Sequence, residues 1–259
     1  MKVYQLKMNH WTALIACWLI VIGHCSPIKA QKVVEVEAQA ELTSKYLWRG
    51  LEKGGISIQP SVKLSWQNAY FSAFGSKSFD KDNAEEIDLT IGYKAPFGLN
   101  ISISDYWQTG IEPNDVFFEY RKKKQTAHRL EGNLGYSCKY FSLQAYCIFY
   151  GHDFKIDNGK QAYSTYIELA APFRLSGLDW TFKAGMTPME SAGEKIVSEL
   201  GYALHYTYAD GPACVLASLR ATKNLPLRGA VVPVYFELNT NPYLKKMHVL
   251  GGVAIKLTK

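Results

Sequence analysis

The sequence predicts an all-β fold: a single transmembrane antiparallel up-and-down β-barrel of about twelve strands, preceded by a signal peptide. Three observations predict this fold. Apolar and polar residues alternate in segment after segment, the links between these segments alternate in length, and a short apolar stretch lies near the N-terminus. The composition agrees, with a mean hydropathy of −0.13 and 20% charged residues. A helical membrane protein would be more apolar, whereas a barrel needs only one apolar face on each strand.

The clearest alternation runs from Ile56 to Trp66. Apolar residues occupy every second position of this segment, and polar residues lie between them. Successive side chains of a strand point to opposite faces of the sheet, so one face of this strand is apolar and the other is hydrated. The segment is about ten residues long, which suits a tilted strand that crosses a membrane.

The same alternation of apolar and polar residues predicts strands along the rest of the chain. The expected strands are residues 34–42, 56–66, 69–79, 85–94, 99–107, 127–138, 141–150, 161–171, 178–186, 213–222, 232–239 and 247–257. Short links follow the second, fourth, sixth and eighth strands, with turns at Gln67-Asn68 and Lys139-Tyr140, whereas most other links are longer and more polar. Bacterial outer-membrane barrels show this asymmetry, with tight periplasmic turns and long outer loops.

Residues 187–212 fit more than one structure. Val197 to Tyr208 fits a thirteenth strand, but Ile196, Leu200 and Leu204 recur at helical spacing. Single-chain bacterial barrels carry an even number of strands. We therefore expect residues 187–212 to form a long outer loop that holds either a short helix or an extension of the flanking hairpin.

The N-terminal segment has the features of a cleaved export signal. Lys2 and Lys7 precede an apolar run from Trp11 to Gly23, which is too short to span a bilayer as a helix, and Ala30 offers a cleavage site. The expected organisation is a signal peptide at 1–30 and one outer-membrane β-barrel at 31–259.

Three cysteines remain in the expected mature chain. Cys138 and Cys147 fall on adjacent strands, in a register that pairs residue 138 with 141 and residue 132 with 147. Their sulfur atoms then do not face each other, so we expect no disulfide between them. We interpret these two and Cys214 as small packing residues.

With the apolar stripes outward, the remaining side chains line a polar lumen. The candidate lumen-lining residues carry both signs of charge and are Glu35, Glu37, Arg49, Lys63, Asp88, Glu168, Lys183, Arg220 and Glu237, with Glu41, Arg129 and Glu131 beside them. In a water-filled pore such charges set solute preference. In a narrow interior they pair and neutralise one another. The width of a twelve-stranded barrel does not decide between the two.

Aromatic residues near the ends of the expected strands suggest girdles at the membrane interfaces. The residues in question are Tyr46, Trp48, Trp66, Tyr70, Tyr93, Trp107 and Trp180. Tyr and Trp favour this depth because one end of each ring is apolar and the other is polar.

No motif indicates catalysis, a metal site or a cofactor. His128, His152, His205 and His248 are scattered, and no serine lies in a nucleophile elbow. We expect no enzyme activity, no metal and no cofactor. The basic run Arg121–Lys124 fits a solvated loop tip better than a patch for lipopolysaccharide, and no recognition motif for nucleic acid accompanies it.

Several stretches, in chain order, resemble the Gcw_chp-type porin family of bacterial outer-membrane barrels. The matching stretches are Ser44–Gly50, Ile58–Ser61, Glu86–Tyr93, Tyr163–Glu168, a turn at Pro172-Phe173, and Asn241-Pro242. The resemblance implies an outer-membrane β-barrel in a Gram-negative bacterium and names no substrate.

Three functions follow as hypotheses. The first is a passive porin, or channel, for small polar solutes in the outer membrane. The alternative is a closed structural or surface-binding barrel that acts through its long extracellular loops and transports nothing. The third is a soluble periplasmic β domain, whose alternating apolar residues would form an internal core. The expected partners are the lipid bilayer, lipopolysaccharide and small polar solutes.

Overall fold

The computed structural model describes residues 34–80, 85–109, 116–121, 126–198, 201–227 and 230–258. The expected signal peptide, and residues 122–124 of the basic run, lie outside these ranges. Within them, every regular element is a β-strand. No helix in this part of the chain is long and apolar enough to cross a membrane.

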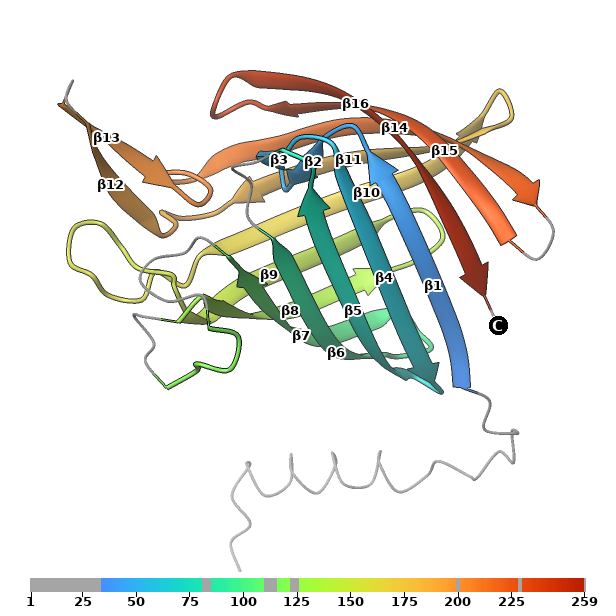
Figure 1. Ribbon diagram of the computed structural model, residues 1–259, viewed down its shortest axis with the longest axis horizontal. Coiled ribbons are helices and arrows are strands. Elements are labelled where there is room, and N and C mark those ends of the chain that lie inside the picture. The colour runs from blue at the N-terminus through green and yellow to red at the C-terminus, as the bar shows by residue number, and fades with distance from the viewer. Residues whose placement is uncertain are drawn as a thin grey trace, which may run out of the picture. The chain divides into compact units, whose positions relative to one another are not determined.

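Twelve strands close into one antiparallel barrel, in which each strand pairs with the barrel strands before and after it in the chain (Figure 1). The barrel strands are β1 (Val34–Thr43), β4 (Ser57–Trp66), β5 (Ala69–Ser78), β6 (Glu86–Lys94), β7 (Leu99–Gln108), β8 (His128–Ser137), β9 (Ser142–Gly151), β10 (Thr165–Leu175), β11 (Leu178–Thr187), β14 (Ala213–Leu227), β15 (Ala230–Asn241) and β16 (Lys246–Thr258). The first strand pairs with the last, so the sheet closes on itself. The predicted twelve-stranded up-and-down barrel is confirmed. Closure pairs the backbone N–H and C=O groups of every barrel strand with a neighbouring strand, since lipid offers them no hydrogen bonds.

The links alternate in length as predicted. Strand β1 begins and β16 ends at the same end of the barrel, and the short turns lie at this end too (Figure 1). The longer links lie at the opposite end, called here the long-link end.

One predicted turn is wrong. Pro172 and Phe173 lie inside β10, and the chain reverses at Ser176-Gly177, where φ is 52° and 72°, as in a two-residue type I′ turn.

Two small hairpins lie within the long links and outside the barrel ladder. The first pairs β2 (Tyr46–Trp48) with β3 (Leu51–Gly54), and the second pairs β12 (Gly193–Ser198) with β13 (Gly201–Tyr206). Residues 187–212 therefore add no barrel strand, as predicted, but they form a separate hairpin. Of the two expected alternatives, the short helix is wrong, because the apolar spacing covers only about two turns, too few to stabilise a helix.

The outer face of the barrel is apolar all the way round. Large apolar side chains are exposed on every one of the twelve barrel strands, including Ile91 on β6, Ile103 on β7 and Val249 on β16. The buried residues of the same strands include many polar ones, such as Ser57 and Glu131. A soluble protein would bury the large apolar side chains and expose the polar ones. This inversion is typical of a transmembrane barrel.

The expected aromatic girdle is right in part. Trp66 and Tyr93 are exposed on the outer face near the short turns. Tyr46 and Trp48 instead belong to β2, which lies inside the barrel, so their assignment to a girdle is wrong. Tyr70 also points inward, where its hydroxyl donates to Asn100.

The cysteines follow the predicted register. The Cys138 backbone N–H donates to the Phe141 carbonyl over 2.9 Å, and Cys147 lies opposite Gly132. Cys138, Cys147 and Cys214 are free thiols, so the predicted absence of a 138–147 disulfide is confirmed.

Candidate functional site

The β2–β3 hairpin turns back into the barrel lumen and carries Arg49 at its tip. Trp48 pairs with Leu51, and between them Arg49 and Gly50 have φ values of 53° and 81°. Positive φ at both central residues defines a type I′ turn, whose twist matches that of a hairpin. Arginine in this conformation costs on the order of 1–2 kcal/mol, so the contacts of Arg49 must offset that cost.

The strongest of these contacts is a buried ion pair with Glu131 on β8. The two terminal nitrogens of Arg49 each donate to one carboxylate oxygen, over 2.6 and 2.7 Å. The two side chains are only 8% and 1% exposed. Tyr106 on β7 donates to the same carboxylate over 2.9 Å. A bidentate arginine–carboxylate pair fixes both distance and orientation, so it fastens the hairpin tip to the barrel wall.

Aromatic rings surround the Arg49 guanidinium. Its central carbon lies 4.1 Å from the ring centre of Tyr146, 4.5 Å from that of Trp48 and 4.7 Å from that of Tyr166. A guanidinium nitrogen also donates to the Tyr208 hydroxyl over 2.5 Å. Cation–π attraction is strongest when water is excluded, so these rings stabilise a charge that would otherwise be costly to bury.

The rings pack together into a small core inside the lumen. Trp48 stacks on Tyr208 with ring centres 5.8 Å apart, and Tyr208 stacks on Tyr166 at 5.5 Å. Buried Val215 and Leu216 on β14 complete the cluster, against which Leu51 also packs. Tyr208 follows β13, so two separate links meet at this core. Together they fill part of the lumen that the strands alone would leave open.

Gly50 allows the hairpin tip to lie directly against β14. A Cβ atom at this position would be 2.1 Å from the Val215 carbonyl oxygen, far inside van der Waals contact. The Asn241 side-chain amide donates to the Gly50 carbonyl over 3.3 Å. Only glycine combines this approach with the left-handed backbone at low cost.

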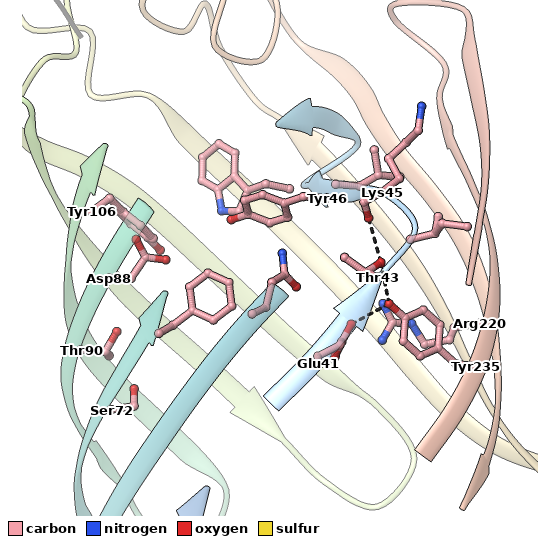
Figure 2. A pocket seen from close by; sticks show the side chains of 15 residues that line it. Glu41, Thr43, Lys45, Tyr46, Ser72, Asp88, Thr90, Tyr106, Arg220 and Tyr235 are labelled. Carbon is pink, nitrogen blue, oxygen red and sulfur yellow. Dashed lines mark hydrogen bonds between the residues drawn. The ribbon is translucent and has the colours of Figure 1, made fainter. Parts of the chain in front are cut away.

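Three cavities border the hairpin. A cavity of about 400 Å³ lies beside Tyr46 and Trp48 and is also lined by Asp88 and Arg220 (Figure 2). A second, of about 260 Å³, lies beside Arg49. A third, of about 690 Å³, lies against Gly50–Lys53 and reaches the second hairpin. The β2–β3 hairpin therefore lies between a wide cavity at the long-link end and two polar cavities deeper in the lumen.

Hydrogen bonds organise the wall of the 400 Å³ cavity. The Tyr235 hydroxyl lies 2.6 Å from a Glu41 carboxylate oxygen and 3.0 Å from the Thr43 hydroxyl, and the Thr43 hydroxyl donates to the Lys45 carbonyl (Figure 2). These bonds run from the barrel wall to the residue just before β2. They hold the start of the hairpin as the Arg49–Glu131 pair holds its tip.

Seven of the nine candidate lumen residues form ion pairs. Arg220 donates to Glu237 over 2.6 Å on neighbouring strands, and Lys183 lies 3.3 Å from Glu168. Glu37 lies 3.8 Å from Lys63 and 3.1 Å from Lys256. Arg49 pairs with Glu131, as described above.

The other two candidates differ. Asp88 lines the 400 Å³ cavity, and one of its buried carboxylate oxygens has no hydrogen-bond partner. Glu35 is exposed at the start of β1. Charge pairing thus covers much of the inner wall, while Asp88 keeps one buried oxygen without a hydrogen-bond partner.

The aromatic partners of Arg49 were not identified from the sequence. Tyr106, Tyr146 and Tyr166 fall at inward positions of predicted strands, which was the available signal. Tyr208 lies in a link whose path the alternation does not predict. Within the described residues, no group of three or more His, Cys, Asp or Glu side chains is placed to hold a metal ion.

Comparison with known proteins finds solved structures that match this chain at low sequence identity. No protein-family model matches the chain, and no curated protein matches it. An outer membrane channel from Pseudomonas putida F1 is 11% identical, with 91% of this chain and 100% of that one covered and a TM-score of 0.42. The NanC porin is 8% identical, with coverages of 88% and 98% and a TM-score of 0.38. OmpF of Salmonella typhi, solved with daunomycin, is 9% identical, with coverages of 88% and 97% and a TM-score of 0.32.

Proposed function

We propose that the protein is a passive channel for small polar solutes in the outer membrane of a Gram-negative bacterium, and that the β2–β3 hairpin forms its constriction. One observation carries the proposal: polar cavities lie on both sides of the hairpin, inside a barrel whose outer face is apolar. A barrel built only as a membrane anchor has no need for polar cavities in its lumen. The proposal includes no catalytic step and no cofactor.

The paired charges would set the preference of this channel among solutes. The Lys183–Glu168 and Arg220–Glu237 pairs both line the 260 Å³ cavity below Arg49. Opposed charges across a narrow passage favour small polar or zwitterionic solutes over apolar ones. Glu37 and Lys63 would play the same role nearer the short turns, with Glu35 at the rim and Asp88 in the 400 Å³ cavity.

Three further assignments belong to the proposal. Residues 1–30 act as a signal peptide that is removed on export, which leaves the barrel from residue 31. The motifs from Ser44–Gly50 to Asn241-Pro242 support membership of the Gcw_chp-type porin family. The basic run that starts at Arg121 follows β7 in a long-link-end loop, where it would meet lipopolysaccharide.

Liposome swelling tests the channel. Purified protein is reconstituted, and its fold is checked by circular dichroism and by its heat-dependent gel mobility. Liposomes that contain folded protein should swell faster in arabinose than in the larger raffinose. Well-folded protein that leaves swelling at the rate of empty liposomes would overturn the proposal.

A closed barrel that acts through its outer loops is the second candidate. The observation in its favour is the core around Arg49, because a buried, bidentate and ring-enclosed arginine fills the lumen at the hairpin. Neutralising Lys183 or Arg220 separates the two functions. A change in ion selectivity supports the channel, and selectivity or leakage that does not respond supports the closed barrel.

A further inference from the structure

The wide cavity at the long-link end, called here the vestibule, is built from seven parts of the chain. They are β3, the end of β7, the start of β8, the link after β9, the β12–β13 hairpin with its flanking residues, the β15–β16 link and the start of β16. Its volume of about 690 Å³ is in the range of sites for small molecules. Gly50 of the hairpin tip borders the vestibule, but the Arg49–Glu131 pair and the rings around it do not line it, so the vestibule is separate from the site around Arg49.

Basic and imidazole side chains dominate the vestibule. They are Lys53, Arg129, His152, His205, Lys246 and His248. Two carboxylates lie among them, Glu52 and Glu194. One Glu52 oxygen is bonded to Lys45 over 2.7 Å, and the other lies 3.8 Å from Nδ1 of His248. The two carboxylates therefore balance only part of the positive charge of the vestibule.

Three polar atoms of these residues are buried without a hydrogen-bond partner. They are Nε of Arg129, Nδ1 of His152 and Nε2 of His248. Arg129 uses one terminal nitrogen to bond Gln108 over 2.5 Å, which fixes its direction and leaves its Nε–H unused. An unsatisfied buried donor lowers the stability of the fold, and a ligand that accepts from it would recover that loss.

Lys53 and Arg129 place two cations near each other, with the carboxylates of Glu86 and Asp88 also acting on Lys53. Within the described residues, neither forms a salt bridge, and the Lys53 ammonium lies 5.1 Å from the ring centre of Trp48. Burial and then the Arg129 charge lower the pKa of Lys53 to about 8, although Glu86 and Asp88 act in the opposite direction. Burial and Arg129 also lower the pKa of His152. Arg129 therefore adds positive potential at both Lys53 and His152, which favours an anion between them.

We propose that the vestibule binds a small organic anion whose carboxylate or phosphate is held by Arg129 and Lys53. His152 and His248 offer further hydrogen bonds, and Phe154 and Tyr206 line the space for the body of the ligand. The inference deepens the proposed channel by naming the class of solute that enters at this end. Binding itself does not need conduction, so the two proposals can fail separately.

Isothermal titration of the intact barrel in detergent micelles tests the site, with glucose 6-phosphate as the probe and glucose as the uncharged control. Arg129→Gln and Lys53→Met each remove one cation, and the second variant covers the case in which the first folds poorly. Lys223→Gln is the matched control, because Lys223 lies at the short-turn end, where it bonds the Gly177 carbonyl. Saturable binding of the phosphate is expected, with each vestibule variant weaker by about tenfold or more and Lys223→Gln unchanged.

The outcomes are distinct. Phosphate binding that both vestibule variants weaken supports the site, even if the same protein shows no conductance and the channel fails. If the barrel conducts but binds glucose 6-phosphate no better than glucose, the proposed channel is supported and the proposed anion site is overturned. Binding that Lys223→Gln weakens as much as Arg129→Gln also overturns it, because the attraction is then only overall charge.

Discussion

Arg49 and Glu131, which are 82 residues apart in the chain, form a bidentate ion pair that joins the β2–β3 hairpin to the barrel wall. A buried ion pair rarely adds much to stability compared with apolar residues of the same shape. Removing one partner is costly, however, because the other charge is then buried and unpaired. Its value here is positional: it holds a hairpin across a lumen that would otherwise be wider.

Replacing Arg49 by alanine should release the hairpin. Glu131 would lose its partner in a buried position, which costs about 3–5 kcal/mol, and movement of the hairpin would relieve that cost by letting water reach the carboxylate. We expect a several-fold higher conductance in planar bilayers from a barrel that still folds. Arg174→Ala is the control, because Arg174 pairs with Asp179 at the exposed short-turn end. Equal conductance in wild type and Arg49→Ala would contradict the role of the pair.

Gly50→Ala should displace the same hairpin for a steric reason. The new methyl group would clash with the Val215 carbonyl oxygen, in addition to the cost of about 1–2 kcal/mol for a left-handed alanine. We expect Trp48 fluorescence to shift to longer wavelength as its ring leaves Tyr208 and meets water. Gly177→Ala carries a similar backbone penalty at φ 72°, but the nearest atom to its Cβ is 4.0 Å away. If both variants shift the spectrum equally, steric contact at β14 is not what fixes the hairpin.

Ion selectivity should change with pH near 8 because of Lys53. Its pKa is lowered to about 8, so its ammonium loses the proton as the pH rises from 7 to 9. The charged groups that act on it are Arg129, Glu86, Asp88 and Arg49. Loss of one positive charge should make the channel prefer cations more strongly, as a reversal potential measures.

Lys53→Met should remove the step near pH 8 from this profile. The titration of Lys53 also makes the free energy of unfolding depend on pH. Between about pH 8 and the ordinary lysine pKa near 10.4, the unfolded chain holds a proton that the folded one has lost. Folding stability should therefore rise with pH across that window. A selectivity profile that keeps its step in Lys53→Met would assign the titration to another group.

Charge on the outer face should be costly at the middle of a strand. Ile103 lies at the centre of β7 with half of its side chain exposed. In a bilayer, Ile103→Arg should cost about 2–4 kcal/mol. Phe118→Arg, in a described link where the residue is 84% exposed, should cost about 0–1 kcal/mol. Urea unfolding from lipid vesicles measures both. Equal costs at the two positions would contradict a membrane-embedded outer face.

The alternation of side chains was enough to predict the barrel. Lipid requires apolar side chains and the lumen requires polar ones, so neighbouring residues of a barrel strand differ in polarity. The alternation in Ile56–Trp66 therefore predicts both that the segment is a strand and which side chains face outward. Links between strands show no such alternation. The resemblance placed a turn at Pro172-Phe173, whereas the chain reverses at Ser176-Gly177 in the same predicted link, where a serine–glycine pair suits positive φ better.

The site was harder to predict than the wall. Arg49 was expected in the lumen, but as a residue of the wall, and its partner Glu131 is distant in sequence. Trp48 was assigned to the membrane interface because composition cannot separate an aromatic ring in lipid from one packed inside a barrel. Only the path of the hairpin distinguishes them, and that path depends on contacts with β8, β9 and β14 together.

Single-channel conductance, compared between the wild-type barrel and a variant in which a short glycine–serine turn replaces residues 45–54, tests the central claim most directly. The account predicts small conductance steps from the wild type and clearly larger steps from the variant, because the hairpin no longer crosses the lumen. Well-folded barrels of both kinds that show no steps, or steps of equal size, would contradict a channel constricted by this hairpin.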